Sequence, residues 1–498
     1  MIEAAPSSST THQPNRHTHN NNTTTIELLL EENKQCNHNL ITSFLEINKS
    51  IGTMEAIRNK LTALIAQAGT APDTLAAEYN ALVQEYLAAG GSPDDLVVKI
   101  GAQFFSPPVP KQKSTGPCED TPVPGSTRID FDYLEQFMLD SFLAIGVPEK
   151  EARICADVLI ESDKRGIDSH GVGRLKPIYF DRIAQGILKP HAPIDIISES
   201  ETSALVDGNL GLGLYIGPYC MDLAIQKAKK YGVGFVACQN STHYGIAGYY
   251  ATMASEQGCV GLTGTNARPS IAPTFGVQPC LGTNPLTWGV PTNDDFPFVL
   301  DCATSINQRG KIEKYARLGH DTPKGMVIDL DGNERTDSVG ILEDMKRGRC
   351  ALCPVGGAGD ELAGYKGYGW ATVVEMLSTA FQSGPFGAKV SGVNQETGAP
   401  APMPLGHFFL AIDIEKLCPL ATFQNNASNL LGFIRGSQKD PLGPGRIWTA
   451  GEPEHDARLR RTAAGGVIVP PALLKDMRNL RDTLPGMQEK YSKLVFEE

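Results

Sequence analysis

The sequence lacks the features that mark membrane-spanning and secreted proteins. None of its 498 residues falls in an uninterrupted apolar run of 18, so the sequence predicts no membrane-spanning helix. The N-terminus is rich in Ser, Thr, Asn and His and has no apolar segment leading to a cleavage site, which argues against a secretory signal. Arg is also scarce there, which argues against an organellar transit peptide. We therefore expect a cytoplasmic protein.

Positive charge is in deficit. The 44 Lys and Arg residues face 56 Asp and Glu residues, and the net charge of -12 argues against nucleic acid or an anionic membrane as the main partner. An anionic ligand would then need a locally basic pocket. The 11 cysteines are an odd number and are scattered, which suits reduced thiols. The single CxxC, Cys350 to Cys353, has no second pair near it, so we predict no metal site.

The common nucleotide and hydrolase motifs are missing. A glycine-rich turn over residues 208–217 follows a strand-like run, but its glycine spacing does not match GxGxxG. The next strand-like run also ends without the acidic residue that would hold a ribose, so the segment does not predict a Rossmann domain. GxxxxGK[ST], HExxH and GxSxG are absent as well.

Composition divides the chain into four parts. Residues 1–52 are polar and low in complexity, and we expect a disordered tail. Residues 53–105 show helical periodicity and predict a small helical module, whose third helix would start at Ser92. Residues 106–127 hold six prolines and predict a linker. Residues 128–498 alternate apolar β-type runs with helical stretches, which is an α/β pattern.

The segment RGIDSHGVGR, residues 165–174, places a histidine beside an arginine. On a helix starting at His170, Arg174 would share its face. Histidine is the side chain best suited to move a proton near neutral pH, and arginine can form two hydrogen bonds to a carboxylate. The alternative is a helix capped by Asp168 or Ser169, with His170 as an ordinary residue of the first turn.

A second histidine falls in CQNSTHYGIAGYY, residues 238–250. His243 follows a predicted strand, and a helix is expected to begin near Gly245. Active sites of α/β proteins are often placed at such strand-to-helix turns. The alternative is a capping segment in which Ser241 or Thr242 is the cap.

Glycine, Asn and Thr are frequent between residues 261 and 311. Small residues let backbone N–H groups approach a phosphate, and Asp301 would place a carboxylate at the edge of a sheet. Lys366 lies in a Gly/Tyr turn before a long apolar helix, where a cation opposes the helix dipole and so indicates an anionic ligand. The alternative for the glycine-rich segments is a set of tight turns around a sheet. The alternative for Lys366 is a solvated loop lysine.

These segments together resemble one family, the type-2 malate/L-lactate dehydrogenases, which include ureidoglycolate, sulfolactate and 2,3-diketogulonate oxidoreductases. The resemblance spans residues 128–485 and rests on seven segments in order: ADVLIESDKRGIDSHGVGRL, VACQNSTHYGIAG, GLTGTNARPSIAPTFG, GTNPLTWGVP, DCATSINQRGK, GYKGYGWATVVEML and GHFFLAID. It implies an α/β, non-Rossmann mixed-sheet fold. It also implies a homodimeric enzyme that uses NAD or NADP to interconvert a small 2-hydroxy acid and a 2-oxo acid.

The resemblance also implies roles for individual residues. His170 and His243 match the histidines given proton-transfer roles, and Ser169 and Arg174 match the substrate side. The positions that match cofactor contacts are Asn266, Asp301, Thr304, Ser305, Lys366, Gly451 and Glu452. Which histidine is the proton donor stays open.

The sequence departs from the family at several points. Ile178 stands where some relatives carry a substrate-side tyrosine, the usual PGE reads AGE at residues 450–452, and residues 343–365 form an unusual piece before Lys366. NAD versus NADP and the identity of the acid stay open. Two rival functions remain: an inactive scaffold or partner-binding paralogue, and a hydrolase with Ser169 or Ser241 as nucleophile.

Overall fold

The structure is a computed structural model with two compact units, residues 1–112 and residues 113–498. The described residues are 52–67, 72–88, 91–92, 120, 122–441 and 443–497. The expected disordered tail up to residue 51, the third helix of the helical module and most of the predicted linker lie outside them. The domain boundaries therefore stay predictions.

The described part of the first unit is a pair of packed helices, α2 (Gly52–Gln67) and α3 (Pro72–Ala88). Their apolar residues recur every three or four positions, which puts them on one face of each helix. The side chains buried on these faces are Ile57, Leu61, Leu64, Tyr79, Leu82 and Tyr86. Both helices were expected from this periodicity, and both are present.

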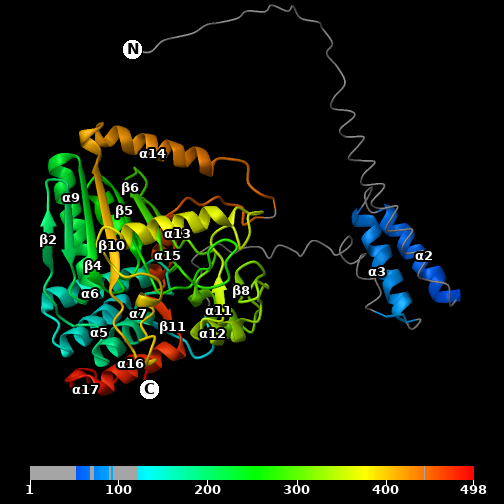
Figure 1. Ribbon diagram of the computed structural model, residues 1–498, viewed down its shortest axis with the longest axis horizontal. Coiled ribbons are helices and arrows are strands. Elements are labelled where there is room, and N and C mark those ends of the chain that lie inside the picture. Colours follow the sequence, from blue (N-terminus) through cyan, green and yellow to red (C-terminus); the bar gives the residue numbers. More distant parts are fainter. Residues whose placement is uncertain are drawn as a thin grey trace, which may run out of the picture. The chain divides into compact units, whose positions relative to one another are not determined.

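A seven-stranded mixed sheet forms the centre of the second unit (Figure 1). In spatial order its strands are β2 (Asp195–Glu199), β3 (Ser203–Asp207), β4 (Val233–Ser241), β10 (Leu405–Asp413), β5 (Cys259–Thr265), β6 (Leu286–Val290) and β7 (Phe298–Cys302). Within this sheet β3 and β4 are parallel and every other neighbouring pair is antiparallel. The mixed sheet confirms the α/β, non-Rossmann expectation.

Strand β10 is inserted between β4 and β5, although it lies far from both in the sequence. Phe409 pairs with Val236 on one side and with Thr263 on the other. The same strand brings His407 into the sheet, opposite Cys238 and Thr265.

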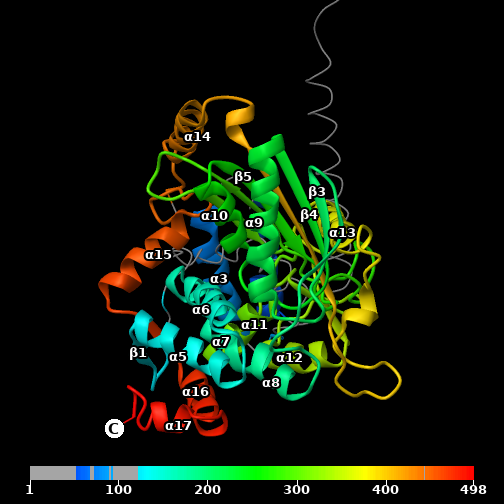
Figure 2. The same cartoon turned by 90° about the vertical axis from the view of Figure 1, so that its left-hand side faces the viewer.

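Helices cover both faces of the sheet (Figure 2). α9 (Gly213–Tyr231) and α10 (Ala247–Glu256) pack on one face, and α13 (Gly364–Thr379) packs on the other. A close approach explains a glycine at the α13 face, because a Cβ at Gly406 would lie 1.7 Å from the Ser378 carbonyl oxygen. The chain turns that lead into these helices position the site described below.

A helical layer packs at one end of the sheet. It contains α5 (Phe131–Ala144), α6 (Glu149–Lys164), α16 (Pro471–Thr483) and α17 (Met487–Lys490), beside a two-stranded sheet of β1 (Thr127–Ile129) and β11 (Val467–Val469). The Asp130 carboxylate caps helix α5 by accepting the amide protons of Asp132 and Tyr133. Fully buried residues of this core include Leu134, Phe137, Phe142, Leu159 and Tyr179.

A smaller lobe follows β7 in the chain. It comprises α11 (Arg309–Leu318), α12 (Ser338–Lys346), β8 (Val327–Asp329) and β9 (Cys350–Leu352) around its own apolar cluster. The unusual piece before Lys366 thus supplies the end of α12, strand β9 and the turn that follows it. Cys350 and Cys353 are buried free thiols. Among the described residues, no group of three or more His, Cys, Asp or Glu side chains is placed to hold a metal ion.

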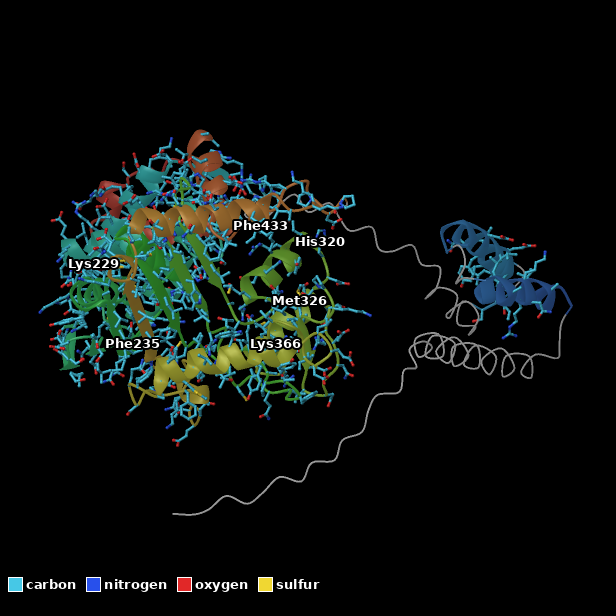
Figure 3. All side chains as sticks on the ribbon, turned by 90° about the horizontal axis from the view of Figure 1, so that it is seen from above. Lys229, Phe235, His320, Met326, Lys366 and Phe433 are labelled. Atoms are coloured by element: carbon cyan, nitrogen blue, oxygen red, sulfur yellow. The ribbon has the colours of Figure 1, made fainter. Side chains whose placement is uncertain are left out.

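The remaining elements are α7 (Val172–Arg174), η1 (Leu175–Phe180), α8 (Asp181–Ala184), η2 (Gly387–Val390), η3 (Ile414–Lys416), α14 (Leu420–Arg435) and α15 (Glu452–Ala463). Figure 3 shows Lys366 on α13 and Phe433 on α14, two helices with strands of the sheet between them. Within the described ranges, every helix is too short or too polar to cross a bilayer.

Candidate active site

Two histidine rings stack in the second unit. His170 lies in the turn between α6 and α7, and His243 lies in the turn between β4 and α10. Their ring centroids are 5.5 Å apart and their planes differ by 20°. The structure therefore brings together the two segments that the sequence singled out separately.

The turn that carries His170 is fixed by the buried carboxyl group of Asp163. Gly171 has a φ of +64°, and a Cβ there would lie 2.3 Å from Oδ1 of Asp163. The Val172 amide donates to Asp163 over 2.9 Å, and the Ser169 hydroxyl shares a 2.9 Å hydrogen bond with Nδ1 of His170. The alternative reading of this segment as a capping motif is wrong, because Gly171 is the N-cap residue and no side chain caps α7.

Arg174 is held near His170 by a different contact from the one expected. A helix was expected to align it with His170, but α7 is only three residues long and starts after the histidine. Instead, Nε of Arg174 donates to the carbonyl oxygen of Ser169. This leaves the outer guanidinium nitrogens for another acceptor, and one of them lies beside Gly310 at the start of α11.

His243 is held by a buried tyrosine. The Tyr179 hydroxyl is 2.7 Å from Nδ1 of His243, and the Gly245 amide donates to the same nitrogen over 3.3 Å. A hydroxyl both donates and accepts, so Tyr179 serves either ring tautomer. The Gly245 amide bonds to the tautomer whose proton is on Nε2. When Nδ1 carries the proton instead, Nδ1 gives up that bond and donates to Tyr179, and Nε2 is free to act as a base. When both ring nitrogens carry protons, Tyr179 still accepts from Nδ1.

The segment around His243 is not the capping segment that was the alternative. The N-cap residue of α10 is Ile246, and the helix begins at Ala247, two residues later than expected. The Thr242 hydroxyl instead accepts from the Gly213 amide at the start of α9. A third, fully buried histidine supports the turn, because Nε2 of His407 lies 3.2 Å from the Thr242 carbonyl oxygen and donates to it.

Burial and positive charge keep both histidines neutral. The pKa of His170 is lowered from 6.5 to about 3, first by burial and then by the charge of Arg174. The pKa of His243 is also lowered well below 6.5, by burial, by His170, and by Arg174 and Arg182. A bound anion would offset the arginine charges and raise both pKa values. The site is thus arranged to take up a proton together with an anionic substrate.

The arginines near the histidines form a basic cluster that the sequence analysis missed, apart from Arg174. Its other members are Arg182, Arg268 and Arg309, and the charges of this cluster act on one another. Their pattern in the sequence is that of solvated helix and loop charges, which is why no signal distinguished them. Arg309 is paired with Glu313 over 2.9 Å, so Arg174, Arg182 and Arg268 supply the positive charge that an anionic ligand needs in a chain of net charge -12.

Three of the expected cofactor residues, Thr304, Ser305 and Lys366, lie near one another. The Ile306 amide donates to Cys353, and the Val355 amide donates to Thr304, so the segment after β7 pairs with the turn after β9. That turn leads into α13, where Lys366 is exposed in the first helical turn instead of in the preceding turn as expected. Ser305 is buried, and its hydroxyl has no hydrogen-bond partner among the described residues.

Asn266 is part of the interior. Its amide oxygen accepts from the Gly406 amide over 2.9 Å, and its amide nitrogen lies 3.3 Å from the Glu375 carboxylate. Asn284 donates to the other Glu375 oxygen over 2.7 Å, and Thr304 donates to the Asn284 carbonyl. This network links β5, α13 and the segment that carries Thr304. It positions the surrounding backbone.

The other expected cofactor residues lie along β7. Asp301 accepts from the Gly248 amide at the start of α10 over 2.7 Å. The Ala450 carbonyl accepts from the Val299 amide, and a Cβ on the next residue, Gly451, would lie 2.7 Å from the Pro297 carbonyl oxygen and 3.0 Å from the Val299 nitrogen. Glu452 is buried and already paired with Arg435, Arg446 and the Thr449 amide. It therefore stabilises the segment that carries Gly451.

These residues fit an anionic dinucleotide. Lys366 has no carboxylate partner among the described residues, and α13 has no acidic residue in its first turn. In the turn before that helix Gly356 and Gly357 have φ values of +98° and +89°. Gly356 packs against the Ala363 backbone, whereas Gly357 faces open space and leaves room for a phosphate. The buried, unpaired hydroxyl of Ser305 is a further polar group that a ligand would satisfy.

The fold and the site together define an acid–base enzyme for a small organic anion on a non-Rossmann α/β scaffold. Residues 129–478 match the family model described as malate/L-lactate dehydrogenase. The chain is 43% identical over 325 residues to a malate dehydrogenase of Pyrococcus horikoshii, a match that covers 65% of this chain and 87% of that protein. It is 38% identical to an L-sulfolactate dehydrogenase of Methanocaldococcus jannaschii, covering 66% of this chain and 89% of that protein.

A solved structure agrees with these sequence matches. The crystal structure of malate dehydrogenase from Entamoeba histolytica superposes with a TM-score of 0.70 at 38% identity, covering 74% of this chain and 99% of that one. The chain belongs to the malate/L-lactate dehydrogenase family. It is an NAD(P)-dependent oxidoreductase that acts on small 2-hydroxy acids.

Proposed function

We propose that His170, His243 and Arg174 carry the acid–base and binding steps of a 2-hydroxy acid dehydrogenase reaction. The observation that supports this most strongly is the stacked histidine pair beside an arginine with no carboxylate partner among the described residues. Ser169 contributes through its carbonyl, which orients Arg174, and through its hydroxyl, which orients His170.

Arg174 would hold the substrate carboxylate. Its guanidinium is anchored at Nε, and the remaining N–H groups can form two parallel hydrogen bonds to a carboxylate. This fixes the carbon that bears the hydroxyl or oxo group beside the histidines, which lowers the barrier by positioning. A bound nicotinamide cofactor would supply or accept hydride at that carbon.

His243 would transfer the proton. In the oxidation direction Nδ1 keeps its proton and donates it in a hydrogen bond to the Tyr179 oxygen. The unprotonated Nε2 accepts the proton of the substrate hydroxyl. In the reduction direction the doubly protonated ring returns that proton to the substrate oxygen, while Tyr179 accepts from Nδ1. His170 would orient the same oxygen from the stacked ring. Acid–base catalysis of this kind contributes about 10²–10⁴-fold.

The cofactor would be held by the residues after β7 and at the start of α13. Ser305 and Lys366 supply the buried hydroxyl and the exposed cation, whereas Thr304, Asn266 and Glu452 are engaged in internal hydrogen bonds and position the backbone. Asp301 on β7 and Gly451, the N-cap residue of α15, would border the same site. The cofactor would be NAD or NADP, and a comparison of the two in the assay below decides between them.

We also propose a cytoplasmic homodimer. Two helices expose large apolar side chains, which in a soluble enzyme usually marks an interface. Trp370 and Met376 on α13 are 55% and 56% exposed, and Leu430 and Phe433 on α14 are 59% and 79% exposed. The cysteines in the described part of the chain are free thiols, in keeping with a reducing compartment. Sedimentation equilibrium of the full-length protein tests the assembly.

The experiment that tests the function uses purified full-length protein, NADH or NADPH, and a panel of 2-oxo acids. Reduced nicotinamide absorbs at 340 nm, so a fall in absorbance with one acid identifies the substrate and the preferred cofactor. Cofactor binding without turnover would point to an acid outside the panel. Absence of both binding and turnover would favour the scaffold, and labelling of Ser169 or Ser241 by a fluorophosphonate would favour the hydrolase.

A further inference from the structure

A buried arginine on α15 holds the turn that carries His170. Figure 2 shows α15 beside α6, the helix that leads into this turn. Arg461 is 2% exposed, and its Nη1 donates over 2.6 Å to the Asp163 carbonyl oxygen near the end of α6. Its Nη1 and Nη2 also lie 2.8 and 3.0 Å from the two carboxylate oxygens of Asp168. The guanidinium group therefore joins the last turn of α6 to a residue two positions before His170.

A further contact of Arg461 comes from a residue outside the family match. The match to the family model begins at residue 129, and Asp120 lies before it. One Asp120 oxygen accepts from Nε of Arg461 over 2.8 Å and from Nη2 over 2.6 Å. The other Asp120 oxygen lies 4.0 Å from Arg128 of β1. The chain before the matched region is thus bonded to the same guanidinium group as the His170 turn.

The two carboxylates keep Arg461 charged and fix its orientation. Burial lowers the pKa of a guanidinium group, but the hydrogen bonds and charges of Asp168 and Asp120 outweigh burial, and the pKa of Arg461 is raised. Asp120 is the acceptor for the Nε side of the group, whereas Asp168 faces the Nη side. Without Asp120 the buried Nε–H group would lose this acceptor, which favours a different orientation of the guanidinium plane.

The turn fixed in this way carries two groups that the proposed mechanism uses. The Ser169 hydroxyl bonds to Nδ1 of His170, and the Ser169 carbonyl accepts from Nε of Arg174. The His170 amide donates to the Ile167 carbonyl oxygen over 3.0 Å, which closes a tight turn around Asp168. A displacement of Asp168 therefore moves His170 and the anchor of Arg174 together.

We propose that Asp120 and Arg461 are positioning residues for the dehydrogenase reaction. Asp120 orients Arg461, and Arg461 holds the His170 turn in the geometry that binds and protonates the substrate. This inference rests on the proposed function of the site. It gives a residue of the chain before position 129, which the family model does not cover, a part in activity. Both residues act through the turn and not by contact with the substrate.

The test follows the kinetics of the full-length protein with the 2-oxo acid that the wild type reduces. Asp120 has a partly exposed side chain, so Asp120→Ala leaves the core intact. We expect kcat/KM to fall about tenfold in this variant, a loss typical of hydrogen bonds between charged groups. Part of the loss should be a higher KM for the acid, because the turn also anchors Arg174. The Kd for NADH should stay at the wild-type value.

A second measurement separates positioning from reduced folding. A less completely folded variant would lower kcat with the concentration of active enzyme and leave KM unchanged. Hydrogen exchange of the backbone amides in residues 162–174 should be at least about tenfold faster in Asp120→Ala, because the turn opens more often. Exchange in the strands of the central sheet should stay at the wild-type rate.

A double variant tests whether the two residues act in series. If Asp120 acts only through Arg461, adding Asp120→Ala to Arg461→Gln lowers kcat/KM no further. Arg461→Lys keeps the charge but not the fork of donors, so it should recover part of the activity lost in Arg461→Gln.

The control is Glu149→Ala, which removes the acid of an exposed ion pair with Arg153 at the other end of α6. Exposed pairs contribute little, so the kinetics and the exchange rates should stay at their wild-type values. Wild-type KM and exchange in Asp120→Ala, or additive losses in the double variant, would overturn the inference and leave the proposed function standing. A wild type that reduces no 2-oxo acid would remove the proposed function, and the inference with it.

Discussion

His170 and His243 stack with their ring centroids 5.5 Å apart, one from the turn after α6 and one from the turn after β4. Two imidazolium rings at this distance repel each other, so the pair takes up one proton more readily than two. Tyr179 bonds to His243, whereas the Ser169 hydroxyl bonds to His170. These different partners support a division of roles, with His243 moving the proton and His170 orienting the substrate oxygen.

Tyr179 should act as a positioning residue for His243. Replacing it in Tyr179→Phe removes the acceptor for Nδ1–H, which destabilises the protonated ring and lowers the pKa of His243 in the substrate complex. We expect kcat for 2-oxo acid reduction to fall about tenfold, a loss typical of one hydrogen bond to a charged group. The alkaline limb of the pH–rate profile should move to lower pH.

The matched control is Tyr219→Phe, which alters a partly exposed tyrosine on α9. A purely structural role for Tyr179 would lower the rate by the same factor at every pH. An unmoved alkaline limb would therefore remove Tyr179 from the proton path.

Asp163 should make the unfolding free energy depend on pH. Burial raises its pKa from 3.8 to about 8, against the opposing hydrogen bond from Val172. Between about pH 4 and pH 8 the folded state keeps this proton while the unfolded state releases it. The contribution of Asp163 to stability is therefore present at low pH and is lost as the pH rises through 8.

The Asp163→Asn variant tests this sign. Asn still accepts from the Val172 amide but does not ionise, so the variant should gain stability relative to the wild type as the pH rises from 5 to 8. Urea unfolding at pH 5, 6.5 and 8 measures the difference. A difference that stays constant over this range would show that Asp163 is ionised in the folded protein at neutral pH.

Lys366 should contribute to cofactor affinity more than to substrate affinity. It lies exposed in the first turn of α13 and, within the described ranges, pairs with no carboxylate. In Lys366→Glu the Kd for NADH, measured by fluorescence, should rise at least about tenfold, because an attraction to phosphate becomes a repulsion. Lys324→Glu, in the exposed turn before β8, is the charge-matched control. Equal Kd values for the two variants would place the cofactor phosphates elsewhere.

Arg174 should be needed for its fork geometry and not only for its charge. In Arg174→Lys the two parallel hydrogen bonds to a carboxylate are reduced to a point contact, and the anchor to Ser169 is lost. We expect KM for the 2-oxo acid to rise about 30-fold or more. Arg317→Lys on the exposed side of α11 is the control. Retention of the wild-type KM in Arg174→Lys would assign the carboxylate to another cation.

Local elements were predictable from the sequence because local physics determines them. The apolar spacing of α2 and α3, the Asp130 cap of α5 and the strand-to-helix turn at His243 all depend on residues close in the chain. Helix α7 was not predictable in this way. Pro177 lies within the following segment and lacks an N–H group, and the chain there forms the π-type turn η1.

The long-range parts of the site could not be read from local patterns. β10 enters between β4 and β5 from far along the chain, so nothing near His243 indicates that His407 supports its turn. Arg182 and Arg268 look like ordinary solvated charges until the fold places both in one cleft. Glu452 was expected at the cofactor, and only the structure shows that Arg435 and Arg446 already pair with it.

The most direct test of the central claim is the turnover of His170→Ala and His243→Ala with the 2-oxo acid that the wild type reduces. We expect kcat to fall at least about 100-fold in each variant, because in the proposed mechanism each histidine bonds to the reacting oxygen. NADH binding, followed by fluorescence, should stay measurable. Wild-type turnover in either variant would contradict the account for that histidine, and wild-type turnover in both would show that the stacked pair is not the catalytic centre.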